Sequence, residues 1–155
     1  MKRWIVYLLI LAAVSFEGAY SFTGTDVAKL APVEVVWLEE RDGVLYLQTD
    51  TKDFGTGTDV QSALADMKAS ASGTVFLDTA DFLLIKEGNE SLIEQMYAIL
   101  RPTCMLCVAA QMPDMEAVAE FLTAHEPNVT LRQFQNGKMT LPILQEIEGR
   151  FTLLA

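Results

Sequence analysis

The chain has 155 residues, of which 51% are hydrophobic, and its 21 acidic and 11 basic residues give a formal charge of −10. This length suits one domain, and the high apolar content with only two cysteines excludes both a disordered chain and a small disulfide-stapled protein. The negative charge argues against a nucleic-acid partner, because phosphates repel carboxylates. We therefore expect no nucleic-acid binding.

The N-terminal residues have the pattern of a secretory signal peptide. Two basic residues precede an unbroken apolar run over residues 4–14, and small residues stand three positions and one position before the expected cleavage site. Cleavage is expected between Ser21 and Phe22, so residues 1–21 form the predicted signal peptide. An uncleaved anchor is the alternative, although Glu17 interrupts the stretch well before the roughly 20 apolar residues that a membrane span needs.

The rest of the chain is expected to consist of a short tether and one exported domain. Residues 22–32 contain Thr, Gly, Asp and Pro without a clear period and are predicted to be a tether. Residues 33–155 are predicted to form a single mixed α/β domain, because no linker long enough to divide them is present. The expected location is outside the cell, either secreted or associated with the outer face of the cytoplasmic membrane.

The domain is expected to begin with two antiparallel strands. Residues 33–39 and 44–48 are rich in β-branched and aromatic residues, and Asp42-Gly43 between them suits a type I′ hairpin turn. The next stretch, residues 50–57, is polar and rich in glycine and is predicted to be a loop.

Three helices are expected after this hairpin. Residues 58–72 have an apolar face, with Thr58 and Gln61 as a capping pair. A second helix is predicted from Asn89 to about Leu100, and a third begins at Pro113 and ends near His125.

Short apolar runs between and after these helices are predicted to be strands. They are residues 74–77, 82–85, 104–110, 129–131, 141–144 and 151–154. Helices that alternate with buried strands predict an α+β fold, in which a mixed sheet carries about three helices and ends in a β-rich C-terminal tail.

Cys104 and Cys107 form a C-x-x-C pair, which in an exported protein can be a dithiol/disulfide couple. Both lie in an apolar run that is predicted to be a strand, where positions i and i+3 point to opposite faces and the Cα atoms lie roughly 10 Å apart. That separation exceeds disulfide reach. Two buried thiols are therefore expected, and a secreted thiol-disulfide protein is the alternative, which needs a helix to begin after Thr103.

A glycine-rich loop and several acidic residues are candidate ligand sites. Residues 55–58 precede a helix, where an anion could bind, but a third glycine or a Gly-Lys-Ser/Thr sequence is missing, so a turn and helix cap are expected. A small-molecule binding module that uses this loop stays open as an alternative. A calcium loop through Asp50, Asp53 and Asp59 is rejected, because its spacing requires oxygen ligands where Lys52 stands.

Catalytic groups are equally sparse in the sequence. Asp78 and Asp81 are expected to be turn residues rather than an acid/base pair. His125 could act with a cysteine only if the fold placed the two side by side, and no complete hydrolase or metalloprotease motif occurs. We therefore predict a protein that is not an enzyme, with no catalytic residues, no cofactor and no metal.

Several segments resemble the N-terminal domain of the spore-germination C-subunit proteins, the Ger(x)C family. The resemblance rests on Thr58 with Ala63-Leu64, Val75-Phe76-Leu77, Phe82-Leu83-Leu84-Ile85, Arg101-Pro102, Met105 to Ala110, and the tail motifs at residues 129–134, 141–144 and Gly149. The chain would be a shortened and diverged relative, with Asp78-Thr79 where the family usually has Gly-His.

The resemblance implies a role in an assembly. Members of this family act with membrane subunits in nutrient germinant receptors. The expectation is therefore an exported, non-enzymatic domain that works by protein–protein contact at the outer face of the membrane, with multi-spanning receptor subunits as the implied partners.

Overall fold

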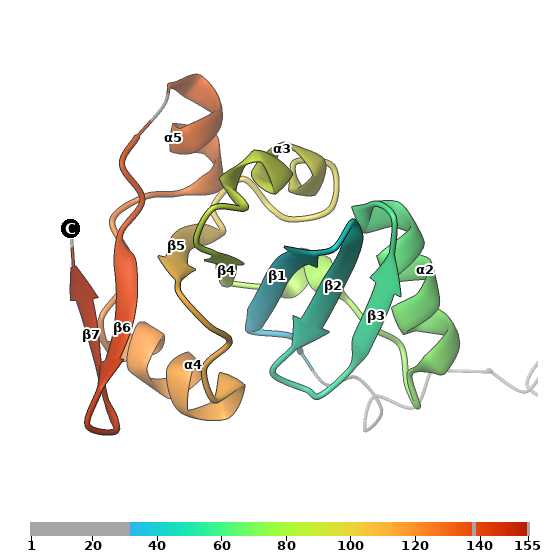
Figure 1. Cartoon of the computed structure of the whole chain (residues 1–155), viewed down its shortest axis with the longest axis horizontal. Coiled ribbons are helices and arrows are strands. Elements are labelled where there is room, and N and C mark those ends of the chain that lie inside the picture. The colour runs from blue at the N-terminus through green and yellow to red at the C-terminus, as the bar shows by residue number, and fades with distance from the viewer. Residues whose placement is uncertain (1–31, 138, 155) are drawn as a thin grey trace, which may run out of the picture.

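The computed structural model describes residues 32–137 and 139–154 of the chain. The predicted signal peptide, its cleavage site and the tether up to residue 31 lie outside these residues. The described strands are β1 (Val35–Arg41), β2 (Val44–Thr49), β3 (Phe54–Gly57), β4 (Phe82–Lys86), β5 (Met105–Ala109), β6 (Ile143–Ile147) and β7 (Arg150–Leu154). They form one seven-stranded sheet in the order β3-β2-β1-β4-β5-β6-β7 (Figure 1).

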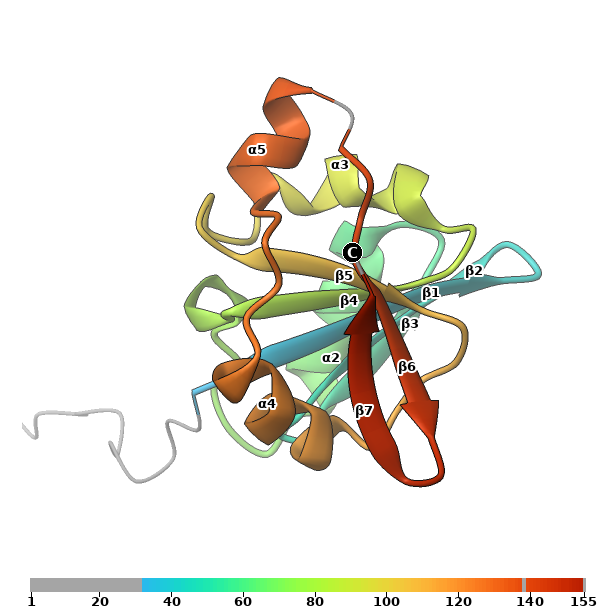
Figure 2. The ribbon, with the colours of Figure 1, turned by 90° about the vertical axis from the view of Figure 1, so that its left-hand side faces the viewer.

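Helices cover both faces of this sheet. They are α2 (Val60–Ser70), α3 (Ile93–Met96), α4 (Met115–Ala124) and α5 (Leu131–Asn136), with short 3₁₀ turns η2 (Leu77–Thr79) and η3 (Glu90–Leu92). One core cluster packs under α2, α3 and α5, and a second packs under α4 and the β6–β7 hairpin. Figure 2 shows α3 and α5 on one side of the sheet and α4 on the other. The predicted α+β fold is confirmed.

The centre of the sheet is parallel and its two borders are antiparallel. β1, β4, β5 and β6 run in the same direction, while β1–β2, β2–β3 and β6–β7 are antiparallel pairs. Residues 82–85 of β4 and 106–109 of β5 are buried throughout, as expected for parallel strands covered on both faces. The predicted β1–β2 turn is also present, with positive φ at Asp42 (54°) and Gly43 (76°).

Two predictions around α2 are wrong in their details. Residues 54–57 form β3 rather than a loop, and this strand pairs with β2. The helix is capped by Asp59, whose Oδ1 accepts a hydrogen bond from the Ser62 amide at 2.8 Å, and not by Thr58 with Gln61. Ser62 completes the capping box from its side chain, which is the same motif shifted by one residue.

Three further segments differ from the sequence-based expectation. Residues 74–77 are not a strand, since the chain there is irregular and turns into η2. Residues 129–131 make only an isolated bridge to Met105, after which Thr130 and Gln133 form the capping box of α5. The helix expected from Asn89 to Leu100 is reduced to η3 and α3. Asn89 does not cap it, since its side chain accepts a hydrogen bond from the Glu40 amide at 2.9 Å.

Candidate functional site

One part of a sheet face is covered by none of the helices that the structure describes. The buried residues of α4 pack on the parts of β1, β4 and β5 that carry Trp37, Leu84 and Cys107. Beyond that contact, the same face continues over β2, β3 and the ends of β1 and β4. We call this region the open face and define it by Glu39, Arg41, Val44, Tyr46, Gln48, Phe54 and Lys86.

Apolar and aromatic side chains are exposed on the open face. Phe54 is 59% exposed, and Tyr46 and Val44 are each 37% exposed. A hollow of about 220 Å³ lies among Tyr46, Phe54 and the charged residues, and it is also lined by Gln111 and Met112 from the β5–α4 connection. Exposed aromatic side chains beside a hollow make this region the candidate interaction site, because aromatic residues are enriched at interfaces.

A buried carboxylate lies at the centre of this surface. The Glu39 side chain is 7% exposed, and its Oε1 accepts hydrogen bonds from Lys86 Nζ at 2.5 Å and from Arg41 Nη2 at 2.8 Å. Arg41 Nε also donates to this oxygen at 3.2 Å. Burying a carboxylate is costly unless it is paired, so the two cations compensate for the burial of Glu39 on the open face.

The ionisation of Glu39 is decided by opposing effects. Burial raises the pKa of this carboxyl, but hydrogen bonds and charge attraction from Lys86 and Arg41 outweigh burial and lower the pKa below its ordinary value. Glu39 is therefore a carboxylate at neutral pH. In this state it accepts hydrogen bonds and has no proton to donate to a substrate.

The open face has a surplus of positive charge in an acidic chain. Two cations surround one carboxylate, and the Arg41 and Lys86 side chains are 62% and 34% exposed, so both present donors to solvent. The Arg41 guanidinium also lies 5.6 Å from the centre of the Tyr46 ring, a cation–π contact that holds it beside the hollow. The arrangement suits a carboxylate that is next to an apolar group.

The two cysteines lie away from the open face, on opposite sides of β5. Cys104 belongs to the core under α2, α3 and α5, whereas Cys107 belongs to the core under α4. Both thiols are free and buried, and burial raises the pKa of each to about 12. No helix begins after Thr103, because the chain enters β5 at Met105. The strand geometry that separates the thiols is therefore as expected.

Both thiols are predicted to be unreactive in the folded protein. A thiol with a pKa of about 12 is ionised roughly a thousandfold less at about pH 8 than a free cysteine, and only the thiolate attacks a disulfide reagent. Labelling with an aromatic disulfide should therefore be slower by about a thousandfold or more in buffer than in denaturant. Rapid native labelling of either thiol, or a mass loss of two hydrogens that reductant reverses, would support the redox alternative instead.

The glycine-rich loop is occupied by the protein's own side chains. The Thr56 amide donates to Asp66 Oδ2 at 2.9 Å, and Asp59 accepts from the Ser62 amide at the start of α2. An anion at residues 55–58 would have to displace these carboxylates. Within residues 32–137 and 139–154, no group of three His, Cys, Asp or Glu side chains is arranged to hold a metal ion.

The remaining candidate catalytic residues are Asp78, Asp81 and His125, which lie in separate parts of the structure. Asp81 forms an ion pair with Arg101 on the protein surface, while Asp78 is exposed in η2. His125 ends α4, where its Nδ1 lies 3.2 Å from the Phe121 carbonyl oxygen and its ring stacks on Phe121 at 4.6 Å. These residues are not gathered into one site.

The open face was not predicted from the sequence. One signal was available, because Glu39 comes directly after a continuous buried run and lies on the same strand face as Val35 and Trp37. A charge at such a position needs partners. Lys86 at the end of the apolar run of β4 was the matching clue.

Comparisons with protein-family models, with curated proteins and with solved structures found no match to this chain. The resemblance to the Ger(x)C family therefore stays a prediction. In the part of the chain that the structure describes, no helix has both the length and the apolar composition to cross a membrane.

Proposed function

We propose that this chain is an exported, non-enzymatic domain that binds a protein partner through the open face. The observation that carries the proposal is the exposure of Tyr46 and Phe54 around the Glu39 carboxylate and its two cations. Interfaces are enriched in aromatic residues and arginine at their centres, where such side chains contribute most of the binding energy. The open face combines both.

The chemistry of the surface suggests what the partner presents. Arg41 and Lys86 keep donors free for an anion, and Phe54 provides an apolar surface beside them. The partner segment is therefore one that places a carboxylate next to an apolar side chain. Complementary charge of this kind directs association and suppresses wrong partners.

The proposed location and the proposed assembly rest on the sequence pattern. The proposed signal peptide places the domain outside the cell, and the Ger(x)C resemblance suggests that the partner is a multi-spanning subunit of a germinant-receptor-like assembly at the outer face of the membrane. If the host forms spores and loss of the gene leaves nutrient germination unchanged, the receptor version of the proposal is wrong.

Photo-crosslinking in the producing cell tests the open face directly. A photoreactive phenylalanine analogue at Phe54 should give an adduct with a protein of the cell envelope, identified by mass spectrometry. The matched control is the same analogue at Phe76, an exposed phenylalanine in the connection between α2 and β4. Arg41→Glu should remove most of the Phe54 adduct, since it replaces a cation by an anion beside the hollow.

The outcomes distinguish specific binding at the open face from nonspecific crosslinking. An adduct at Phe54 that depends on Arg41 and is absent at Phe76 supports it. Equal adducts at both positions, or a Phe54 adduct that Arg41→Glu leaves unchanged, would contradict it. Because Arg41 is largely exposed but pairs with Glu39, circular dichroism and urea unfolding of Arg41→Glu must show that the fold is retained.

A further inference from the structure

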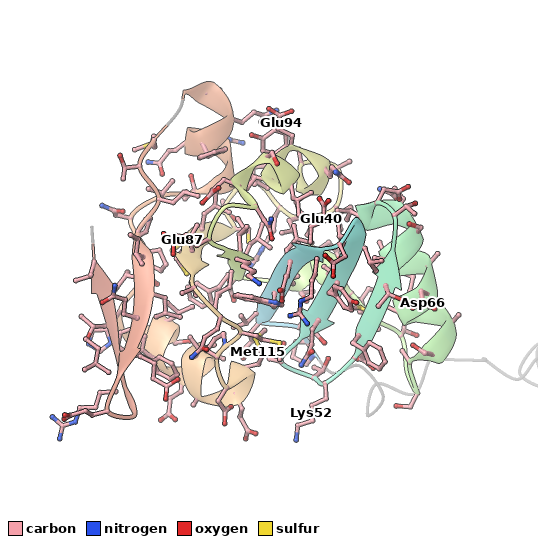
Figure 3. The ribbon with its side chains drawn as sticks, viewed as in Figure 1. Glu40, Lys52, Asp66, Glu87, Glu94 and Met115 are labelled. Atoms are coloured by element: carbon pink, nitrogen blue, oxygen red, sulfur yellow. The ribbon has the colours of Figure 1, made fainter. Side chains whose placement is uncertain are left out.

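The two edge strands of the sheet differ in whether their outward backbone groups find hydrogen-bond partners elsewhere in the chain. In β3, the pairing of Thr49 with Asp53 through a 2.9 Å backbone hydrogen bond means that Phe54 and Thr56 direct their backbone groups outward. Helix α2 meets these groups with side chains. Asp66 accepts from the Thr56 amide at 2.9 Å, and Ser70 donates to the Phe54 carbonyl at 3.4 Å. Figure 3 shows Asp66 on α2 beside this strand.

At the opposite edge, β7, no described residue provides such cover. Figure 1 shows β7 at the outer margin of the sheet, with no described element beyond it. Within the described residues, no backbone group outside the β6–β7 hairpin donates to or accepts from this strand. An uncovered edge of this kind can pair with another strand.

The hairpin turn determines which backbone groups are free. Glu148 and Gly149 have φ values of 50° and 73°, so the turn has two residues and is of the I′ kind. The flanking pair Ile147–Arg150 exchanges backbone hydrogen bonds, and the pattern then alternates along the hairpin. Phe151 and Leu153 are therefore the residues whose amide and carbonyl groups point away from β6.

From this arrangement we infer that β7 is a self-association edge, at which a second copy of this chain adds its own β7 in antiparallel orientation about Thr152. In that register Phe151 of each copy faces Leu153 of the other, and all four free backbone groups of each strand find partners. The two Thr152 side chains face each other, which is a favourable cross-strand pair.

The charges at this edge do not oppose the pairing. The register places Arg150 of each copy opposite Leu154 of the other, so no like charges meet directly across the two strands. The chain as a whole has a charge of −10, but salt at physiological strength screens exposed charges beyond about 8 Å. The exposed apolar side chain of Leu154, at 43%, would be covered in the pair.

Like-charge substitution at the symmetry axis tests the inference. Thr152 is exposed, so Thr152→Lys and Thr152→Glu are compatible with the fold. Light scattering after gel filtration should give a dimer for the wild-type full chain and monomers for each variant alone. An equimolar mixture of the two variants should recover a dimer of one copy of each, because the opposed charges then attract.

A matched control places the same added charge at a position away from the two-fold axis of the proposed dimer. Gln145 lies opposite Thr152 on β6, on the same exposed face of the hairpin, so Gln145→Lys should leave the dimer intact. Thr152→Lys should weaken association by about tenfold or more relative to that control, which is about 1.4 kcal/mol. A wild-type monomer at the highest soluble concentration, or a Thr152→Lys dimer of wild-type strength, would overturn the inference.

Discussion

Replacing Gly55 by alanine is expected to destabilise the folded protein by about 3 kcal/mol or more. A Cβ atom at this position would lie 2.1 Å from the Ala63 carbonyl oxygen, 2.5 Å from the Met67 amide nitrogen and 2.8 Å from the Met67 Cβ atom. Two of these atoms belong to the backbone of α2, which cannot move aside without displacing the helix from β3 and β2. The expected loss is a large share of the usual stability of a domain, about 5–15 kcal/mol.

Urea unfolding followed by circular dichroism measures this effect. The control is Gly137→Ala, because no atom lies within 4 Å of a Cβ there and the backbone is extended, with φ at 177°. That variant should remain within about 0.5 kcal/mol of the wild type. Equal stability of the two variants would show that β3 does not pack against α2 as closely as described.

Glu39→Gln is expected to lower the free energy of unfolding by about 1–2 kcal/mol at neutral pH. The amide keeps the shape of the side chain but removes the charge that Lys86 and Arg41 surround. The cost is held below that of a fully buried pair because both cations are partly exposed. The loss should be measured by urea unfolding, with Glu40→Gln as a control on the same strand, since the Glu40 side chain is exposed.

The difference in the free energy of unfolding between wild type and Glu39→Gln should decrease as the pH falls. The folded-state pKa of Glu39 is lowered, so its contribution to stability is present above the unfolded-state value, about 4.3, and disappears as pH falls through the lowered folded-state value. The two proteins should therefore converge at acid pH. A difference that is constant from neutral to acid pH would contradict the ion-pair assignment.

Local signals predicted most of the sheet. Asp42-Gly43 predicted the β1–β2 hairpin because only a few residue types accept positive φ at both turn positions. The run of residues 104–110 predicted a strand buried on both faces, and this confirmed strand is β5. In each case the information lies within about ten neighbouring residues of the sequence.

The sequence-based predictions were wrong where two local signals competed or where the deciding contacts lie far apart in the sequence. Residues 54–57 look like a loop because Gly55 and Gly57 have low strand propensity, yet the missing side chains let α2 approach β3. Residues 129–131 look like a strand, but Thr130 and Gln133 form a capping box, and the cap decided the structure.

The candidate site was not predictable for a related reason. Glu39 and Lys86 are 47 positions apart and become neighbours only because β1 and β4 pair in parallel. No local pattern records that pairing. The exposure of Tyr46 and Phe54 depends likewise on where α4 ends its contact with the sheet, which is a property of the whole domain.

Cys107 on β5 and Cys104 just before this strand give the molecule a pair of internal reporters. Cys104 samples the layer under α2, α3 and α5, and Cys107 samples the layer under α4. Each thiol becomes accessible only when its own layer opens, so the ratio of their modification rates distinguishes a molecule that loosens one layer at a time from one that opens both together. This short segment thus allows the cooperativity of the two cores to be followed without any added label.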